Sequence, residues 1–487
     1  MWRKTAMRNS NTMTIRLSPL ALQNTTTSAT WFEELRLSFS GQNVHVDAKV
    51  GIPLYGPRSL NTARHKSEVH IGFIGAAQAI ESARSFYETC AQGVSGGHDY
   101  APFPGCMRDR GYRCDLRFNQ ALIEPISRQE SQDIVKIRSS RERFEELLAL
   151  STAKMKILTQ RDHPLDYVVF ALPEDMYKEC RVADYIERGK GPVHRDLRRA
   201  FKARAMSFLK PTQILRETTA GAVFSQSREL DHPSRIAWNL FTGMYFKVDG
   251  LPWGPTGLAP ATCFIGISFF RPLGSSSTLR TSVVQAFDEN GDGLVLRGHD
   301  FHWAVTERTP HVSAEMAKSL IDMVLARYRE ERRQPPQRVV VHKSSRFENA
   351  EREGFEEALR GISRYDLIAL HPDSNIRLAR AGQYPPLRGT SFQLGDDSYL
   401  YTSGYLSSLG KYPHGHVPSP LQITDHVGDT PRSQLLREIL VLTKMNWNSA
   451  NFSGVKPITL RFSQLVGDIL REVPEDQVPE PKYKYYM

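Results

Sequence analysis

The run HRDLRRAFKARAMSFLKPTQ, residues 194–213, decides how the rest of the chain is interpreted. Its periodicity predicts a helix over 193–209, after which Gln213 opens the next segment. Residues four apart on a helix share a face, which would align His194, Arg198 and Lys202. A stripe of donors beside a helix end suits a phosphate group, although a solvated basic helix has the same spacing.

The segments before this run alternate between strands and helices. Buried strands are predicted at 69–75 and 167–173, and amphipathic helices at 77–90 and 130–154. This order is typical of an α/β domain with a parallel sheet. Ligands of such sheets bind at the carboxyl ends of the strands, so the basic helix after the strand at 167–173 is well placed to meet one.

A second α/β unit follows. It opens with a strand, continues through a hairpin around a tight turn, and then alternates helices with strands. Ser313 is predicted to cap the longest of these helices. The expected strands are 263–270, 278–287, 294–298, 339–343 and 365–371, and the expected helices are 313–333 and 349–361.

Composition limits the possible classes of protein. The 487 residues carry a formal net charge of +10, which suits a polyanionic partner without requiring one. Five scattered Cys without a Cys-x-x-Cys pair fit a reducing cytoplasm and give no zinc signature. No apolar run is long enough for a membrane span, and residues 1–30 are expected to be a flexible leader rather than a signal peptide.

Several motifs, taken together and in order, resemble the short prokaryotic Argonautes. They are GIPLYGPRSL at 51–60, YFKVDGLPW at 245–253, LTKMNWNS at 442–449 and PITLRF at 457–462. The resemblance implies a Rossmann-like MID domain over 31–245 and a ribonuclease-H-like PIWI domain over 246–487. In YFKVDGLPW, Asp249 replaces a Gly of the family's pattern.

The resemblance also implies a site for the 5′-phosphate of a small guide strand. Its candidate residues are His194, Arg198, Lys202, Gln213 and Lys247. In the family, the carboxylate of the last residue, here Met487, helps hold a divalent ion on that phosphate, so Mg²⁺ is the expected cofactor. A frayed C-terminal tail is the alternative.

PIWI nucleases hold two metal ions with converging carboxylates. The matching positions carry Ser268, Ser344 and Asn446, which cannot replace carboxylates around two dications. We therefore expect a protein that does not cleave nucleic acid. The alternative is an active nuclease with displaced acids, for which the acidic turn at 288–292 offers candidates.

The resemblance further predicts a nucleic-acid channel lined by Lys343, Arg346, Arg377, Arg388 and Lys444, although solvated surface cations have the same appearance in a sequence. It implies a guide RNA, a single-stranded DNA target and a cytoplasmic complex with an APAZ-containing effector protein. Guide–target pairing would switch on that partner in immunity against plasmids or phage. The segment YGPRSL favours a sirtuin-like NADase as effector, with TIR-like and nuclease effectors as alternatives. A nucleic-acid-binding module without a guide is the third interpretation.

Overall fold

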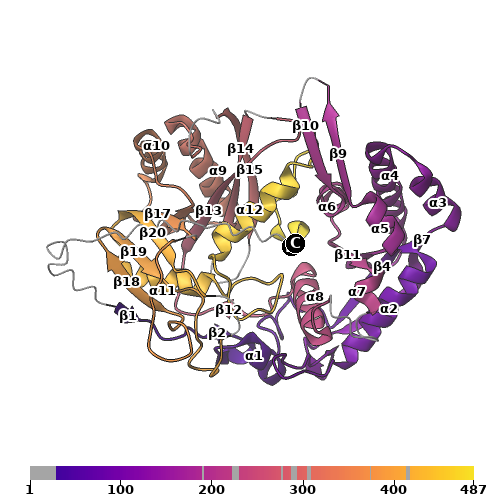
Figure 1. The fold of residues 1–487 in the computed structure, drawn as a ribbon, viewed down its shortest axis with the longest axis horizontal. Helices are drawn as coiled ribbons and strands as arrows, with labels where there is room; N and C mark the ends of the chain where they lie inside the picture. Colours follow the sequence, from indigo (N-terminus) through magenta and orange to yellow (C-terminus); the bar gives the residue numbers. More distant parts are fainter. Residues whose placement is uncertain are drawn as a thin grey trace, which may run out of the picture.

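The computed structural model describes residues 29–188, 191–221, 230–275, 278–286, 293–303, 309–372, 374–412 and 417–487. Two lobes make up this part of the chain: an N-terminal lobe drawn mostly in indigo to magenta, and a C-terminal lobe drawn mostly in rose-brown to orange (Figure 1). The last helix and the C-terminus lie between them. Nearly all of the predicted leader, residues 1–28, and the acidic turn at 288–292 lie outside the description.

The N-terminal lobe is built on a four-stranded sheet in the order β11-β8-β4-β7, with every neighbouring pair parallel. Its strands are β4 (Glu68–Ala76), β7 (Asp115–Ile126), β8 (Tyr167–Leu172) and β11 (Thr212–Arg216). Every residue of β8 is buried, as its uninterrupted apolar run predicts. The α/β prediction for this half is confirmed.

Helices cover this sheet. Ser127 and Ser139 cap α3 and α4 separately, which divides the single helix predicted at 130–154 into two. The helices are α2 (Ala77–Gln92), α3 (Arg128–Lys136), α4 (Ser140–Thr159), α5 (Glu174–Cys180), α6 (Leu197–Ala205), α7 (Glu217–Gly221) and α8 (Pro233–Lys247). Two short hairpins, β5 (Cys106–Met107) with β6 (Arg110–Gly111) and β9 (Val182–Glu187) with β10 (Gly191–Asp196), stand apart from the sheet.

The C-terminal lobe is built on a nine-stranded mixed sheet in the order β1-β18-β19-β20-β17-β16-β13-β14-β15. The predicted hairpin and the parallel strands that follow it form its core, and Ser313 caps α9 as expected. The strands are β13 (Thr262–Phe270), β14 (Thr278–Ala286), β15 (Leu294–His302), β16 (Arg338–Lys343), β17 (Arg364–His371), β18 (Thr390–Leu394), β19 (Asp397–Leu400) and β20 (Leu421–Gly428).

Helices lie on both faces of this sheet. The helices α9 (Ala314–Arg332) and α10 (Asn349–Leu359) pack together on one face, and α12 (Ile458–Leu470) packs across β13 and β14. A side chain at Gly266 in β13 would place its Cβ 2.2 Å from the Thr459 carbonyl oxygen, so only glycine allows α12 to approach this closely. The fourth helix, α11 (Arg432–Leu442), precedes the loop that leads to α12.

The start of the described chain belongs to the C-terminal lobe. Strand β1 (Ala29–Trp31) pairs with β18, and β2 (Leu37–Ser38) pairs with both β3 (Val44–His45) and β12 (Gly254–Pro255). Helix α1 (Ala48–Tyr55) follows β3. The predicted division at residue 31 therefore differs from the structure, because the N-terminal sheet begins only at β4. A strand three residues long carries too little pattern to show which sheet it joins.

Candidate functional site

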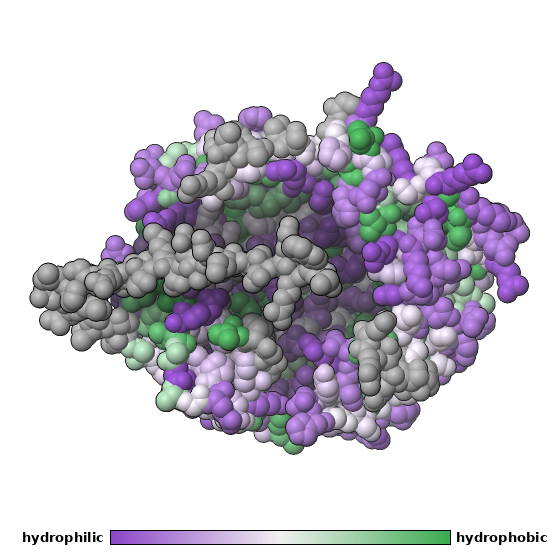
Figure 2. Space-filling view, in the orientation of Figure 1, coloured by the Kyte–Doolittle hydropathy of each residue, from purple (hydrophilic) through white to green (hydrophobic). Residues whose placement is uncertain are grey.

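The candidate site lies between the lobes, where α6, β11, α8 and the C-terminal turn η4 (Tyr483–Tyr486) meet. Helix α6 and η4 are in contact, and so are α8 and η4. In the space-filling view the molecule is hollowed in the middle of this face (Figure 2). Segments from distant parts of the sequence therefore surround one concave region.

The predicted basic helix begins later than its periodicity suggested. Residues 191–196 form strand β10, and the Asp196 carboxylate caps α6 by accepting from the Arg199 backbone N–H at 3.1 Å. His194 pairs with Asp184 across the hairpin, 2.7 Å between Nδ1 and Oδ1, and its side chain is 55% exposed. The prediction that His194 shares a helical face with Arg198 is wrong. An Asp before the first helical turn was the signal available in the sequence.

A basic face of this segment, not identified from the sequence, holds the lobes together. The buried guanidinium of Arg195 pairs with Glu472, 2.7 Å from Nε to Oε2, and with Glu145. Four residues further along the chain, in the first turn of α6, Arg199 pairs with Asp468 of α12 at 2.9 Å. Arg195 of β10 thus pairs with Glu472, just after α12, and Arg199 of α6 pairs with Asp468 of α12, so both arginines join this segment to the C-terminal lobe.

Two lysines from different helices meet at β11. The Lys202 and Lys247 ammonium groups each donate to the Thr212 carbonyl oxygen at 3.1 Å, and Lys247 also donates to Gln213 Oε1 at 2.9 Å. The two lysines are 3% and 1% exposed. The structure thus brings together three of the five residues predicted for the phosphate site.

Arg198 supplies a third cation. Its side chain is exposed to solvent, and it makes no hydrogen bond or ion pair within the described part of the chain. Desolvation lowers its pKa, and it acts electrostatically on both lysines. Burial, which contributes most, and the nearby Arg198 guanidinium together lower the pKa of Lys247 to about 7. Desolvation, Lys247 and Arg198 lower the pKa of Lys202 well below its ordinary value.

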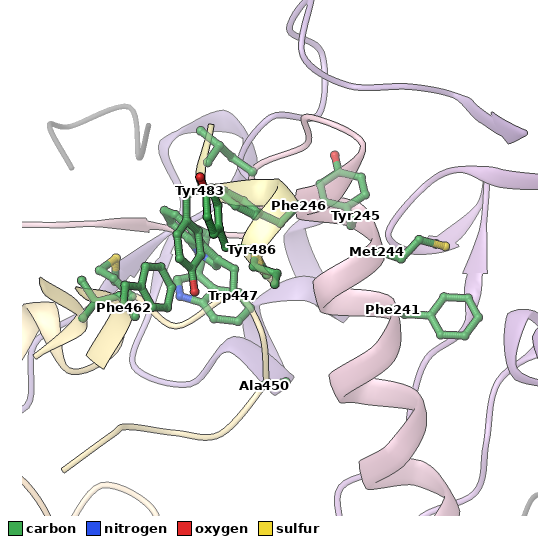
Figure 3. Packing of buried hydrophobic residues seen from close by; sticks show 14 of the residues in the cluster. Phe241, Met244, Tyr245, Phe246, Trp447, Ala450, Phe462, Tyr483 and Tyr486 are labelled. Atoms are coloured by element: carbon green, nitrogen blue, oxygen red, sulfur yellow. The ribbon is translucent and has the colours of Figure 1, made fainter. Parts of the chain in front are cut away.

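The C-terminal residues close one side of the site. The Tyr483 ring stacks on Phe462, and Lys484 pairs with Asp249 at 2.8 Å. Met487 is buried, so a frayed tail is wrong as a description of this end. Met487 belongs to a large buried cluster, and Figure 3 shows some of its aromatic members, which include Phe246, Trp447, Phe462, Tyr483 and Tyr486.

The site suits an anion better than a metal ion. Its side chains supply three cations and one amide, and no Asp or Glu pairs with either lysine within the described ranges. The same ranges hold no group of three or more His, Cys, Asp or Glu that could bind a metal. Of the predicted metal ligands, only the Met487 carboxylate belongs to this chain. These residues alone do not form a site for Mg²⁺.

The three positions matched to nuclease carboxylates lie in the C-terminal lobe. The parallel pairing of β13 with β16 places Ile267 opposite Lys343. Ser268, the next residue of β13, and Ser344, the first residue after β16, therefore lie beside each other in sequence register. Ser268 is buried and Ser344 is exposed. The Asn446 side chain bonds within its own loop, accepting from the Asn448 N–H at 3.1 Å and donating to Ser449 Oγ at 2.9 Å.

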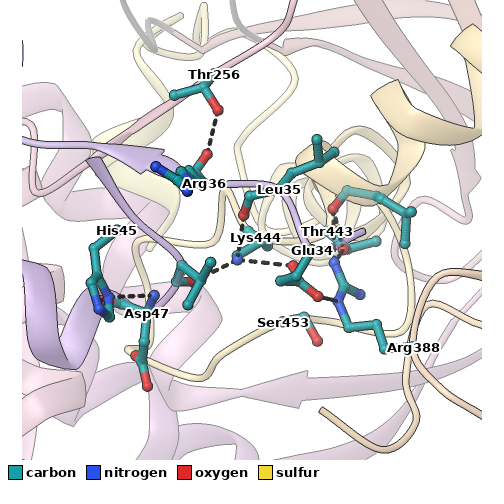
Figure 4. Close-up of polar contacts among 12 residues, drawn as sticks. Glu34, Leu35, Arg36, His45, Asp47, Thr256, Arg388, Thr443, Lys444 and Ser453 are labelled. Atoms are coloured by element: carbon teal, nitrogen blue, oxygen red, sulfur yellow. Dashed lines mark hydrogen bonds and ion pairs between the residues drawn. The ribbon is translucent and has the colours of Figure 1, made fainter. Parts of the chain in front are cut away.

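Three of the five cations predicted to line a channel are instead buried structural groups. Lys343 pairs with Glu351, and both Arg388 and Lys444 pair with Glu34, at 2.8 and 3.0 Å (Figure 4). Lys444 also donates to two backbone carbonyl oxygens. The channel prediction is wrong for these three residues, because each is enclosed with a carboxylate. Arg346 and Arg377 are exposed.

Comparison with solved structures identifies the fold. Clostridium butyricum Argonaute bound to a guide DNA and a 19-mer target DNA matches over 92% of this chain and 54% of its own, with a TM-score of 0.65 and 14% identity. A. aeolicus Argonaute with externally bound siRNA matches over 94% and 56%, with a TM-score of 0.58 and 14% identity. Drosophila Piwi matches over 94% and 56%, with a TM-score of 0.57 and 13% identity.

The chain therefore has an Argonaute-like fold and spans about half the length of these relatives. The MID-like and PIWI-like lobes are the N-terminal and C-terminal lobes described above, so the predicted fold class is confirmed. No protein-family model and no curated protein matches the sequence. Among the described residues, no helix is both long and apolar enough to cross a membrane.

Proposed function

We propose that this protein holds the 5′-phosphorylated end of a small guide strand and uses the guide to bind a complementary single strand. The convergence of Arg198, Lys202 and Lys247 without a carboxylate partner carries the proposal. Charged groups as enclosed as the two lysines are ordinarily paired, and a phosphate would supply the missing negative charge. The fold shared with an Argonaute solved with guide and target DNA supports it.

The proposal includes partners suggested by the sequence motifs. The guide is RNA, the target is DNA, and an APAZ-containing effector chain in the cytoplasm responds when the two strands pair. A sirtuin-like NADase is the preferred effector. The complex would act in immunity against plasmids or phage. Sequencing the nucleic acid that copurifies with the protein tests the guide: a population of short strands with uniform 5′ ends supports it, and random fragments favour a module without a guide.

We also propose that the chain binds its target without cutting it. Two-metal cleavage needs converging carboxylates, and Ser268, Ser344 and Asn446 occupy the matching positions. The test incubates the guide-loaded protein with complementary target and Mg²⁺ or Mn²⁺. We expect intact target. A guide-dependent product that disappears when an Asp or Glu of this chain is substituted would favour the active-nuclease alternative.

The phosphate site itself is tested by equilibrium binding of two guides that differ only at the 5′ end. We expect the phosphorylated strand to bind at least about tenfold more tightly than the hydroxyl strand, because charge-assisted hydrogen bonds contribute roughly 1.5–3 kcal/mol. Arg204→Ala is the control for substitutions of the site cations on α6, since Arg204 is an exposed arginine of that helix. It should leave the ratio of the two affinities unchanged. Equal affinities for the two guides would contradict the proposal.

A further inference from the structure

The two lysines of the phosphate site are unusually close for groups of like charge. Each ammonium nitrogen lies 3.1 Å from the same Thr212 carbonyl oxygen, so the two nitrogens are no further apart than twice that distance. Both side chains are almost completely buried. Among the described residues, the two ammonium groups donate hydrogen bonds only to one carbonyl oxygen and one side-chain amide oxygen.

The groups around the pair do not offset its charge. Helix α6 contributes Arg198, a further cation, and the neighbouring Asp468 of α12 is engaged by Arg199. Strand β8 presents the Tyr167 ring, 5.7 Å from Lys247 Nζ. Burial raises the pKa of the Tyr483 hydroxyl of η4, and Arg461 and Arg198 act electrostatically against that rise. The charged groups that lower the pKa values of the two lysines are Arg198 and, for Lys202, also Lys247, and all of them are cations.

The Tyr483 hydroxyl is a second sign that a ligand belongs here. It is buried and has no hydrogen-bond partner among the described residues. An unmade hydrogen bond of a buried hydroxyl costs roughly 1–3 kcal/mol, so such a group ordinarily meets a partner when the site is filled.

Two buried ammonium groups at this separation, beside an arginine, repel each other strongly because little water screens them. The lowered pKa values of Lys202 and Lys247 agree with this. Near neutral pH the empty site therefore carries fewer than two lysine charges. A phosphate dianion beside the pair would favour the ammonium form of both.

We propose that binding of a terminal phosphate dianion is coupled to the uptake of a proton by the Lys202–Lys247 pair. The proton comes from the buffered solvent, and no covalent bond is made or broken. The inference rests on the proposed phosphate site and deepens it: the site becomes fully charged only when a phosphorylated end occupies it. A hydroxyl end, which brings no charge, takes up no proton.

The test is titration calorimetry of the whole protein with 5′-phosphorylated and 5′-hydroxyl strands at pH 8, in two buffers of different ionisation enthalpy. At this pH the free phosphate is already a dianion, because its second pKa is about 6. The buffer dependence of the heat gives the number of protons exchanged. We expect an uptake of roughly 0.5 or more protons with the phosphorylated strand and a value near zero with the hydroxyl strand.

A substitution of Lys247 shows whether the lysine pair takes up the proton. Lys247→Arg keeps a positive charge that cannot be lost at this pH and should reduce the uptake by at least about half. If this variant fails to fold, the comparison of the two strands on the unmodified protein still decides. Equal heats in the two buffers, or equal uptake with both strands, would overturn the inference. Failure of the phosphorylated strand to bind would instead count against the proposed function.

The pH dependence gives an independent readout. As pH rises from 7 to 9, the affinity for the phosphorylated strand should fall relative to the hydroxyl strand, by up to about tenfold per pH unit for each proton taken up. Lys247→Arg should flatten this slope. A ratio that stays constant across the range would contradict proton coupling.

Discussion

Two groups of buried cations in this molecule differ in one respect. Arg388 and Lys444, beneath the first strand of the chain, share the Glu34 carboxylate. Lys202 and Lys247, between the lobes, share only a backbone carbonyl oxygen. The first group is paired with a carboxylate inside the fold, whereas the second has no carboxylate partner among the described residues. Burial alone therefore does not distinguish a structural cation from a binding one, but the presence or absence of a carboxylate does.

The electrostatics of the two groups follow this difference. Burial lowers the pKa of Lys444 to about 8, and the nearby Glu34 opposes that effect. For Lys247 the pKa falls to about 7 with no carboxylate to oppose it. The pKa of Glu34 is lowered because the two cations outweigh the effect of its own burial. The paired cluster should stabilise the fold, while the unpaired cluster should cost stability until a ligand binds.

Removing the shared carboxylate breaks the structural group and should have the largest effect. Glu34→Ala leaves Arg388 and Lys444 buried without their partner, and we expect the free energy of unfolding to fall by about 3–5 kcal/mol. Denaturant titration measures this. Glu88→Ala, which breaks the exposed pair with Arg84, is the control and should cost less than about 1 kcal/mol. If both variants lost the same small free energy of unfolding, the Glu34 cluster would not be the structural group described here.

Removing one lysine of the Lys202–Lys247 pair should, in contrast, stabilise the protein in the absence of nucleic acid. Lys247→Met removes a buried charge that lacks a carboxylate, so at pH 7 we expect the free energy of unfolding to rise by about 1 kcal/mol. The sign with pH follows from the lowered pKa of Lys247. Between about pH 7 and 10 the unfolded chain binds more protons than the folded one, so wild-type stability rises with pH.

The Met variant should lose part of that rise, and the two stability curves should approach each other toward pH 10. Thermal unfolding without nucleic acid, measured at several pH values, follows both curves. A less stable Met variant at neutral pH would mean that Lys247 is a structural residue after all. The same variant should also reduce the preference for phosphorylated strands.

The smallest effect is expected from removing divalent ions. The pocket presents three cations and, among the described residues, no carboxylate side chain paired with either lysine, and Met487 is the single predicted ligand for Mg²⁺ from this chain. Addition of a chelator should therefore weaken binding of a 5′-phosphorylated strand by less than about threefold, or roughly 0.7 kcal/mol. A loss of tenfold or more would show that the tail carboxylate and a metal ion carry much of the binding.

Local sequence patterns predicted most elements of the fold. The apolar run of β8, the Ser313 cap of α9 and the hairpin of β14 and β15 all lie where periodicity and turn residues indicated. The first strand could not be assigned, because three exposed residues do not specify a sheet. The start of α6 was missed because helical periodicity was extended through Asp196, whose carboxylate caps the helix.

Within the site, Lys202, Gln213 and Lys247 were predicted correctly as neighbours, since the motifs around them keep their order. His194 was not, because it belongs to a hairpin. Sequence spacing also could not separate structural from binding cations. Lys444 lies 410 positions from Glu34, so only the folded chain shows that the two are paired.

Direct contact between the pocket cations and a 5′-phosphate is tested most directly by a double-substitution cycle. The four affinities are those of wild type and Arg198→Ala for phosphorylated and hydroxyl strands of the same sequence. We predict that Arg198→Ala weakens the phosphorylated strand at least about tenfold more than the hydroxyl strand, a coupling of roughly 1.4 kcal/mol or more. Equal losses for the two strands would contradict the assignment of this pocket.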